Sequence, residues 1–266
     1  MLRLNGFAAA VAISVSAAAC SMSTQQEMQM GAQYAAQLNS KLPMVNDASA
    51  NRYINALGDQ LARAGRRGIN YTFYIVNSDV VNAFAVPGGY VYVNRGLIER
   101  TRNMSELAGV LAHEIGHVEH RHGAEQMERM QTANLGVNLA YILLGRQPGA
   151  VEATAVNVAG TAYFARHSRQ AENEADESAV PMLIAAGIHP NGLVSMFELL
   201  VSMQNRSPST MESWFSTHPT TRDRIQHTRS VIGRYSAAQL RNLATSSSSY
   251  NSMKSRLRAL PAAPRS

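Results

Sequence analysis

The sequence predicts an α+β protein that is mainly helical and carries a small antiparallel sheet. Three short runs between residues 71 and 93 are rich in aromatic and β-branched side chains, which favour strands, and turn-forming residues separate them. Apolar residues at helical spacing precede and follow this region. With 266 residues, the chain has room for one ordinary domain with tails or for two small domains. No run of 18 or more apolar residues follows the N-terminus, which excludes a polytopic membrane protein.

The N-terminus predicts an exported lipoprotein. One basic residue precedes a small apolar stretch over residues 6–19, which is shorter than the roughly 20 apolar residues that span a membrane. Cys20 is the only cysteine, which excludes an intramolecular disulfide, and Ala17-Ala18-Ala19-Cys20 resembles a lipobox in which Ala17 replaces the usual Leu. We expect residues 1–19 to be removed as a signal peptide and Cys20 to carry a lipid. The alternative is ordinary cleavage that leaves a free thiol. Ser21 implies sorting to the outer membrane of a bacterial envelope, facing the periplasm.

The segments after the signal predict the elements in order. Residues 20–30 are polar and predict a linker from the lipid anchor. Residues 31–64 hold apolar side chains at helical spacing, which predicts one or two helices. The turn signal at residues 87–89 joins the last two of three predicted strands, which are Tyr71–Val76, Ala83–Val86 and Tyr90–Val93. From Asn103 onward the pattern is mostly helical.

The C-terminal part carries the positive charge. From Arg222 onward there are nine basic residues and one acidic residue, whereas the whole chain has a net charge of only +6. The remainder is therefore nearly neutral, and we expect no nucleic-acid partner for an exported protein. Residues 241–266 predict a basic, Ser-rich, low-complexity tail that is solvated and disordered. The alternative is a tail that binds lipopolysaccharide, anionic lipid or peptidoglycan.

The helix that begins after Asn103 carries the residues with the clearest chemistry. Asn103 and Glu106 form a capping-box pattern that marks its start. His113 and His117 are four residues apart and therefore share one face, where two neutral imidazoles can bind one Zn²⁺. Glu114 lies close enough to take a proton from zinc-bound water. This HExxH pattern, with apolar residues on both sides, predicts a catalytic zinc centre rather than two surface histidines.

A catalytic zinc needs a third protein ligand and one open position. We interpret His120 and His122 as polar residues on the helix surface, because one helix rarely supplies a third ligand without a turn. Glu172 and Asp176 lie four residues apart on a later helix, so one can bind the metal while the other braces a ligand histidine. Spacing alone leaves two neighbouring acids open as alternatives, Glu174 and Glu177.

Four blocks of sequence resemble the HtpX/OMA-type gluzincin metallopeptidases, relatives of the prenyl-protein CAAX protease. They occur in the family's order and are Asn82–Val91, His113–His117, Ser168–Asp176 and Ser216–Ile225. The resemblance implies a zincin-type peptidase domain, which we place over residues 31–240, with the sheet next to the HExxH helix. It implies three zinc ligands, which are His113, His117 and Glu172. It also implies Glu114 as the base.

The resemblance implies roles for three further residues. Asp176 would support a ligand histidine from behind. His218 would sit near the metal, either as a transition-state stabiliser or as a reversible fourth ligand, although from the residues alone it is only a loop histidine before Pro219. Arg224 would neutralise or orient acidic groups near the site.

These observations predict a zinc metalloendopeptidase with one Zn²⁺ per chain. Glu114 would accept the proton as the zinc-activated water attacks a peptide carbonyl. An extended substrate would pair along an exposed strand at Val86, Gly88, Gly89, Tyr90 and Val91, unless this hairpin is simply core. The expected substrates are unfolded or misassembled cell-envelope proteins, and the outer-membrane assembly machinery is a candidate partner.

The chain departs from several family members. It lacks the membrane-spanning helices of the HtpX and CAAX proteases, and no tetratricopeptide array follows Ser230. The remaining likeness is to the compact, exported lipoprotein (LoiP-like) branch. The alternative function is a zinc-containing chaperone or assembly factor for outer-membrane proteins, which rarely cleaves because His218 occupies the open position.

Overall fold

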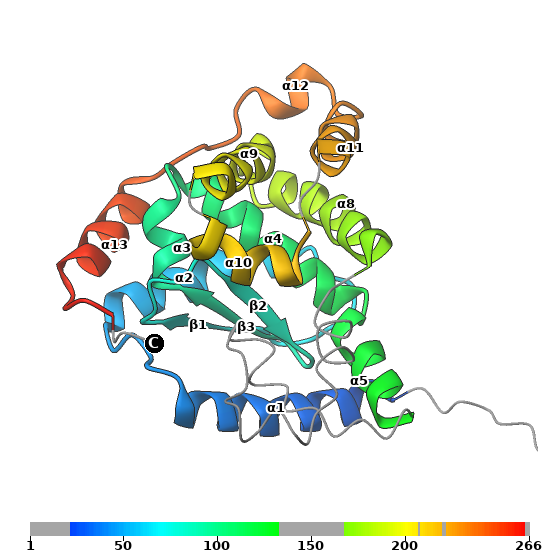
Figure 1. Ribbon diagram of the computed structural model, residues 1–266. Helices are drawn as coiled ribbons and strands as arrows, with labels where there is room; N and C mark the ends of the chain where they lie inside the picture. Colours follow the sequence, from blue (N-terminus) through cyan, green and yellow to red (C-terminus); the bar gives the residue numbers. More distant parts are fainter. Residues whose placement is uncertain (1–21, 133–167, 207, 220–221, 264–266) are drawn as a thin grey trace, which may run out of the picture.

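The computed structural model describes residues 22–132, 168–206, 208–219 and 222–263 (Figure 1). The predicted signal peptide, Cys20 and Ser21 lie outside the described residues. The described part is mostly helical with one small sheet, which confirms the predicted α+β class. No helix within it is long and apolar enough to cross a membrane.

Two helices precede the sheet, α1 (Thr24–Lys41) and α2 (Ala48–Ala62). Helix α1 begins inside the predicted linker, so the linker prediction is wrong from Thr24 onward. Polar composition predicts an exposed linker here, but Glu27 is buried among charged partners. Its carboxylate forms ion pairs with Arg67 Nη2 at 2.7 Å and Arg121 Nη1 at 3.1 Å, which attach α1 to the rest of the protein.

The sheet contains β1 (Thr72–Val76), β2 (Ala83–Val86) and β3 (Tyr90–Asn94) in the order β1-β3-β2. Strands β2 and β3 form the predicted antiparallel hairpin, whose turn uses the positive φ values of Gly88 and Gly89 (84° and 94°). Strand β1 instead pairs parallel to β3. The sheet is therefore mixed, and the prediction of an antiparallel sheet is wrong for β1. The pairing is non-local, because β3 inserts between two strands that precede it in the sequence.

The two faces of the sheet are covered differently (Figure 1). Helix α1 packs on one face through Leu38, against Phe84 and Tyr92. Helices α2 and α4 pack on the other face, in the main core. After β3 come α3 (Arg95–Arg100), α4 (Met104–Glu119) and α5 (His122–Thr132).

Helix α4 lies at the centre of the fold, and every residue from Met104 to Val118 is buried. Its start is as predicted, because Asn103 Oδ1 accepts a hydrogen bond from the Glu106 backbone N–H at 3.1 Å. The Glu106 carboxylate binds Arg102 rather than the cap backbone, so the capping box is half formed. Burial on all sides fixes the direction of the side chains from Met104 to Val118.

Helices α8 (Arg169–Ala185) and α9 (Asn191–Arg206) pack directly on α4. Glycines of α4 allow the close approach: a Cβ at Gly116 would lie 2.8 Å from the Ala175 carbonyl oxygen of α8, and one at Gly109 would lie 2.8 Å from Leu193 Cα of α9. Helices α10 (Pro208–Thr217), α11 (Arg222–Ile232) and α12 (Ala237–Leu240) follow.

The last helix, α13 (Ser248–Ala259), lies in the predicted tail and packs against α2. Tyr250, Met253 and Leu257 are buried in the main core. The prediction of a disordered low-complexity tail is therefore wrong for this segment. The serine run marks a helix start, because Ser247 Oγ accepts a hydrogen bond from the Tyr250 backbone N–H at 3.1 Å.

Candidate metal centre

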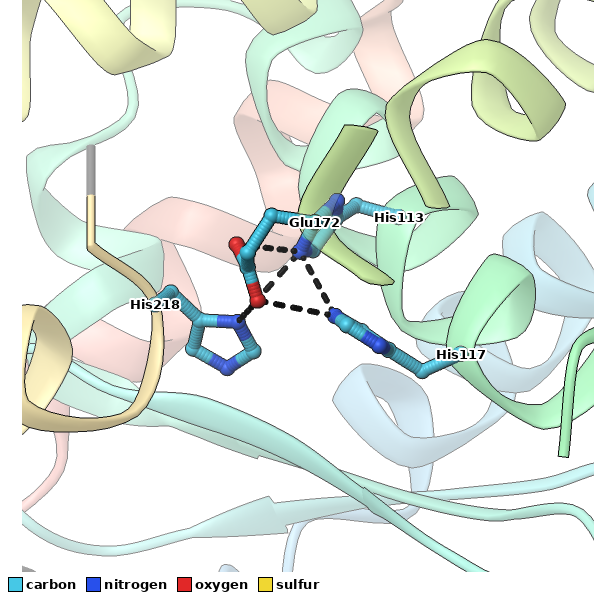
Figure 2. A group of neighbouring side chains, drawn as sticks. All are labelled: His113, His117, Glu172 and His218. Atoms are coloured by element: carbon cyan, nitrogen blue, oxygen red, sulfur yellow. Dashed lines mark hydrogen bonds and ion pairs between the residues drawn. The ribbon is translucent and has the colours of Figure 1, made fainter. Parts of the chain in front are cut away.

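Four buried side chains from three parts of the chain converge on one point. They are His113, His117, Glu172 and His218, and one ligand atom from each lies within 4.8 Å of the others (Figure 2). Both histidines of the HExxH pattern come from α4, Glu172 comes from the first turn of α8, and His218 follows α10 directly. The structure thus brings together the three predicted ligands and the predicted loop histidine.

The two α4 histidines aim the same ring nitrogen at Glu172. His113 Nε2 and His117 Nε2 are 3.0 Å apart. Glu172 Oε1 lies 3.3 Å from His117 Nε2, and Oε2 lies 3.6 Å from His113 Nε2. The helical repeat places the two imidazoles edge to face, with ring centres 4.6 Å apart, and the close crossing at Gly116 brings α8 near enough for the carboxylate to reach both.

Asp176 and Arg224 hold His113 from behind. Asp176 Oδ1 lies 2.8 Å from His113 Nδ1, so the carboxylate accepts the Nδ1–H and leaves Nε2 free to bind a metal. Arg224 donates to both oxygens of Asp176, at 2.6 Å from Nε and 2.8 Å from Nη2. The guanidinium also stacks on Phe197, 4.4 Å from the ring centre. The structure therefore places Arg224 within a buried charge cluster, next to the acids that it was predicted to orient.

Arg224 also contacts Glu172 through Nη1. Burial opposes ionisation of this carboxyl, but Arg224 and His218 outweigh it and hold the pKa of Glu172 well below its usual range. Burial likewise opposes ionisation of Asp176, yet Arg224 and His113 keep the pKa of this carboxyl lowered. Both carboxyls are therefore charged at neutral pH.

Glu114 lies beside the cluster and is buried. Among the described residues its Oε1 has no hydrogen-bond partner, and His218 Nε2 lies 3.6 Å away. Burial raises the pKa of Glu114, against the opposing effect of His218 and His113. A buried carboxylate oxygen without a donor is ready to accept a proton from a molecule that enters the site.

His218 reaches the ligand atoms as well. Its Nδ1 lies 3.2 Å from Glu172 Oε1 and 3.3 Å from His113 Nε2. The backbone N–H of His218 donates to the Trp214 carbonyl at 2.8 Å, which extends α10 and holds the ring over the site. Burial lowers the pKa of His218, but Glu172 and Glu114 outweigh this effect and raise it.

Sequence reasoning missed His122. It was interpreted as a surface residue, but the structure buries it with its Nδ1 only 2.8 Å from His117 Nδ1. Arg121 adopts a left-handed conformation with φ of 61°, so the chain turns back after α4 and brings His122 under the helix. The available signal was the position of His122, five residues after His117. A continuous helix would not bring these two side chains together, and the sequence did not predict the turn at Arg121. His120 is exposed, as predicted.

The predicted substrate strand is only partly exposed. Tyr90 and Val91 belong to β3, which pairs on both sides, so the prediction of an exposed strand is wrong for them. Gly88 lies under α1, where a Cβ would meet Met28 Cα at 3.0 Å. Val86 belongs to β2, which is an edge strand.

Comparison with known proteins identifies the family. Residues 48–232 match the profile of peptidase family M48, and all the side chains of the cluster lie within this range. The chain belongs to peptidase family M48. The resemblance to HtpX/OMA-type gluzincin peptidases is thereby confirmed.

Several curated M48 relatives are similar to the chain. It is 34% identical over 219 residues to the "Beta-barrel assembly-enhancing protease" of Escherichia coli, an alignment that covers 80% of this chain and 45% of that protein. It is 30% identical over 179 residues to "Metalloprotease LoiP" of the same organism, covering 66% of each. "Mitochondrial metalloendopeptidase OMA1" of Arabidopsis thaliana is 32% identical over 159 residues, covering 59% of this chain and 30% of that protein. The chain thus spans less than half the length of the first of these relatives.

The residues of this M48 peptidase fit a metal cofactor. Two imidazole nitrogens and a carboxylate form a donor set that suits a divalent transition metal. The charge of the site also favours a cation, because the described residues of the cluster include three buried carboxyls, which are those of Glu172, Glu114 and Asp176.

Proposed function

We propose that this M48 peptidase is a zinc-dependent endopeptidase that cleaves unfolded or misassembled proteins of the bacterial cell envelope. The convergence of His113 Nε2, His117 Nε2 and the Glu172 carboxylate beside the buried Glu114 carries this proposal. It combines a three-ligand site for zinc with a proton acceptor, which is the combination that peptide hydrolysis needs.

Each side chain has a role in the proposed reaction. A zinc ion held by His113, His117 and Glu172 would acidify a water molecule and polarise the scissile carbonyl. Glu114 accepts the proton of the attacking water at Oε1 and later donates it to the leaving amine. Burial raises the pKa of Glu114 in the metal-free site, which favours uptake of the proton. Arg224 keeps the Glu172 ligand ionised.

The edge of β2 that faces away from β3 pairs with no other described strand, and it is the proposed site for an extended substrate. Asn94 N–H donates to the Asn82 carbonyl at 2.9 Å, so the alternation of an antiparallel pair turns the backbone groups of Ala83 and Ala85 away from β3. Strand β2 packs against α4, the helix that carries Glu114. A substrate strand that paired here would lie next to the site, and backbone pairing selects unfolded segments. The proposed substrate site is therefore the edge of β2, and no longer Tyr90 and Val91 on β3.

The proposed location is the outer membrane, facing the periplasm, with Cys20 as the lipid anchor. The signal-like N-terminal sequence supports this location. The name of the beta-barrel assembly-enhancing relative supports outer-membrane proteins as substrates and their assembly machinery as a partner.

One observation favours a second candidate function, an assembly factor that keeps zinc but cleaves rarely. His218 Nδ1 lies among the ligand atoms, 3.3 Å from His113 Nε2. In this position it supplies a third nitrogen, as a fourth ligand, where a substrate or water would bind. The opposite role, stabilisation of the oxyanion by His218, requires the side chain to move aside first.

Cleavage of a reduced, alkylated and therefore unfolded protein by the zinc-loaded chain separates these functions. The test compares the wild type with Glu114→Gln and His218→Ala. An endopeptidase loses at least about 10²-fold in rate with Glu114→Gln. A rate increase with His218→Ala identifies a ligand that blocks the site, whereas a decrease identifies a stabiliser. If neither the wild type nor His218→Ala cleaves in a Glu114-dependent way, the peptidase proposal is wrong.

A further inference from the structure

The two α4 histidines of the cluster are supported by different kinds of partner. His113 Nδ1 faces the Asp176 carboxylate at 2.8 Å, whereas His117 Nδ1 faces another imidazole, that of His122, at the same distance. The other nitrogen of that ring, His122 Nε2, lies 3.0 Å from Glu174 Oε2. A chain of side chains thus runs from His117 to an acid at the protein surface.

We propose that His122, oriented by Glu174, is the positioning residue that prepares His117 to bind the metal. The inference rests on the proposed zinc site and adds residues to it. Two ring nitrogens 2.8 Å apart share one hydrogen, so one nitrogen donates and the other accepts. The Glu174 carboxylate accepts the Nε2–H of His122, which leaves His122 Nδ1 as an acceptor.

The direction of the shared hydrogen decides whether His117 can bind a metal. With His122 Nδ1 as the acceptor, His117 donates from Nδ1 and its Nε2 carries no hydrogen. This bare nitrogen points at Glu172 Oε1 and His113 Nε2, 3.3 Å and 3.0 Å away. The reverse arrangement would place an N–H among the ligand atoms and prevent binding.

An imidazole suits this position for electrostatic reasons. The buried site already holds the carboxylates of Glu114, Glu172 and Asp176, and each further buried charge without a counter-charge is costly. His122 orients His117 without adding a charge. The acid that orients His122 has a side chain that is 37% exposed, so its charge remains hydrated.

The backbone fixes this chain of contacts. After the left-handed turn at Arg121, helix α5 begins at His122. The centre of the His122 ring then lies 5.0 Å from that of His117. Glu174 projects from α8, and Gln170 Nε2 donates to its second oxygen at 2.8 Å. Helices α5 and α8 both contact α4, and together they fix the position of the His122 ring beside His117.

Zinc affinity, measured by competition with a chromophoric chelator on the full chain, tests the proposal. His122→Asn places an amide oxygen near the Nδ1 position and keeps an acceptor for His117. His122→Gln extends past that position and removes the acceptor. We expect His122→Gln to weaken zinc binding about 10- to 100-fold and His122→Asn to stay within about threefold of the wild type. If His122 had a purely structural role, the restored acceptor in His122→Asn would not preserve zinc affinity.

Glu174→Ala serves as a second variant, because Glu174 is partly exposed and its replacement does not threaten folding. It should weaken zinc binding about three- to tenfold, since His122 loses its orienting acceptor. The control is His120→Asn, which changes the neighbouring histidine that bonds Ser178 at 2.7 Å and should leave zinc affinity unchanged.

Three outcomes would overturn the proposal. One is wild-type zinc affinity in both His122→Gln and Glu174→Ala. Another is a second zinc per chain that disappears in His122→Gln and His120→Asn, because His120, His122 and Glu174 would then form a separate metal site. A wild type that binds no zinc would overturn the proposed function as well, which distinguishes the two failures.

Discussion

The close crossing of α4 and α8 makes a sharp prediction for Gly116→Ala. A Cβ at this position would lie 2.8 Å from the Ala175 carbonyl oxygen and 2.9 Å from its Cα, both backbone atoms that cannot rotate away. The helices must therefore separate by several tenths of an ångström, and such overpacking costs about 1–3 kcal/mol. The higher helix propensity of Ala offsets about 1 kcal/mol. We expect a net loss of about 0–2 kcal/mol in the free energy of unfolding.

The same displacement has a larger effect on the metal site. Ala175 lies within one turn of both Glu172 and Asp176 on α8, so these carboxylates move away from the histidines of α4. A metal site tolerates errors of only about 0.5 Å, and we expect zinc affinity to fall at least about tenfold. Urea unfolding in the presence of a chelator measures stability, and chelator competition measures zinc affinity.

Gly109→Ala is the matched control. Its Cβ would lie 2.8 Å from Leu193 Cα of α9, so the clash is similar, but α9 carries none of the four converging residues. We expect a similar loss of stability with zinc affinity within about threefold of the wild type. If Gly116→Ala binds zinc like Gly109→Ala, the helix crossing does not position the site and the reasoning is refuted.

The remaining predictions concern packing and charge. Leu257→Ala should destabilise the protein by about 2–5 kcal/mol in urea unfolding, because Leu257 is fully buried on α13; the exposed Ser255→Ala is its control, and equal stability of the two would contradict the packing of this helix. Arg224→Ala should cost about 3 kcal/mol or more in the metal-free protein, since it leaves buried carboxylates without their counter-charge; a loss below about 1 kcal/mol would contradict this. The pKa of Asp47 is lowered from 3.8 to about 2, chiefly by its hydrogen bond from Arg256. Ionised Asp47 therefore stabilises the folded protein fully above pH 3.8, and this stabilisation is lost as the pH falls through about 2. The difference in melting temperature between wild type and Asp47→Asn should shrink over that range. A difference that is constant with pH would exclude this ion pair.

Local patterns predicted the elements that depend on neighbouring residues. The bounds of β2, the start of α4 after Asn103 and the shared face of His113 and His117 follow from side-chain type and spacing over a few residues. These features hold in the structure because burial of α4 on all sides reinforces the same periodicity.

Features set by distant contacts were not accessible in this way. The insertion of β3 beside β1 depends on pairing across the sequence. The polar sequence around Glu27 predicts a linker, whereas the fold buries Glu27 through its ion pairs with the distant Arg67 and Arg121. His122 depends on the left-handed turn at Arg121, which the sequence does not mark with Gly or Asn.

The helix in the predicted tail was accessible in principle. Tyr250, Met253 and Leu257 follow a helical spacing, and a serine precedes them as an N-cap. Basic composition and the serine run outweighed this pattern, although the buried residues show that the charged side chains cover only one side of the helix. A short amphipathic pattern is therefore informative even within a low-complexity segment.

Metal analysis of the dialysed protein tests directly whether ligands from α4 and α8 bind one metal ion. The wild type and Glu114→Gln should each retain one zinc per chain, since Glu114 is assigned to proton transfer and not to binding. Glu172→Ala should lose the metal under the same dialysis. A wild type without metal, or a Glu172→Ala variant that keeps its zinc, would contradict the account.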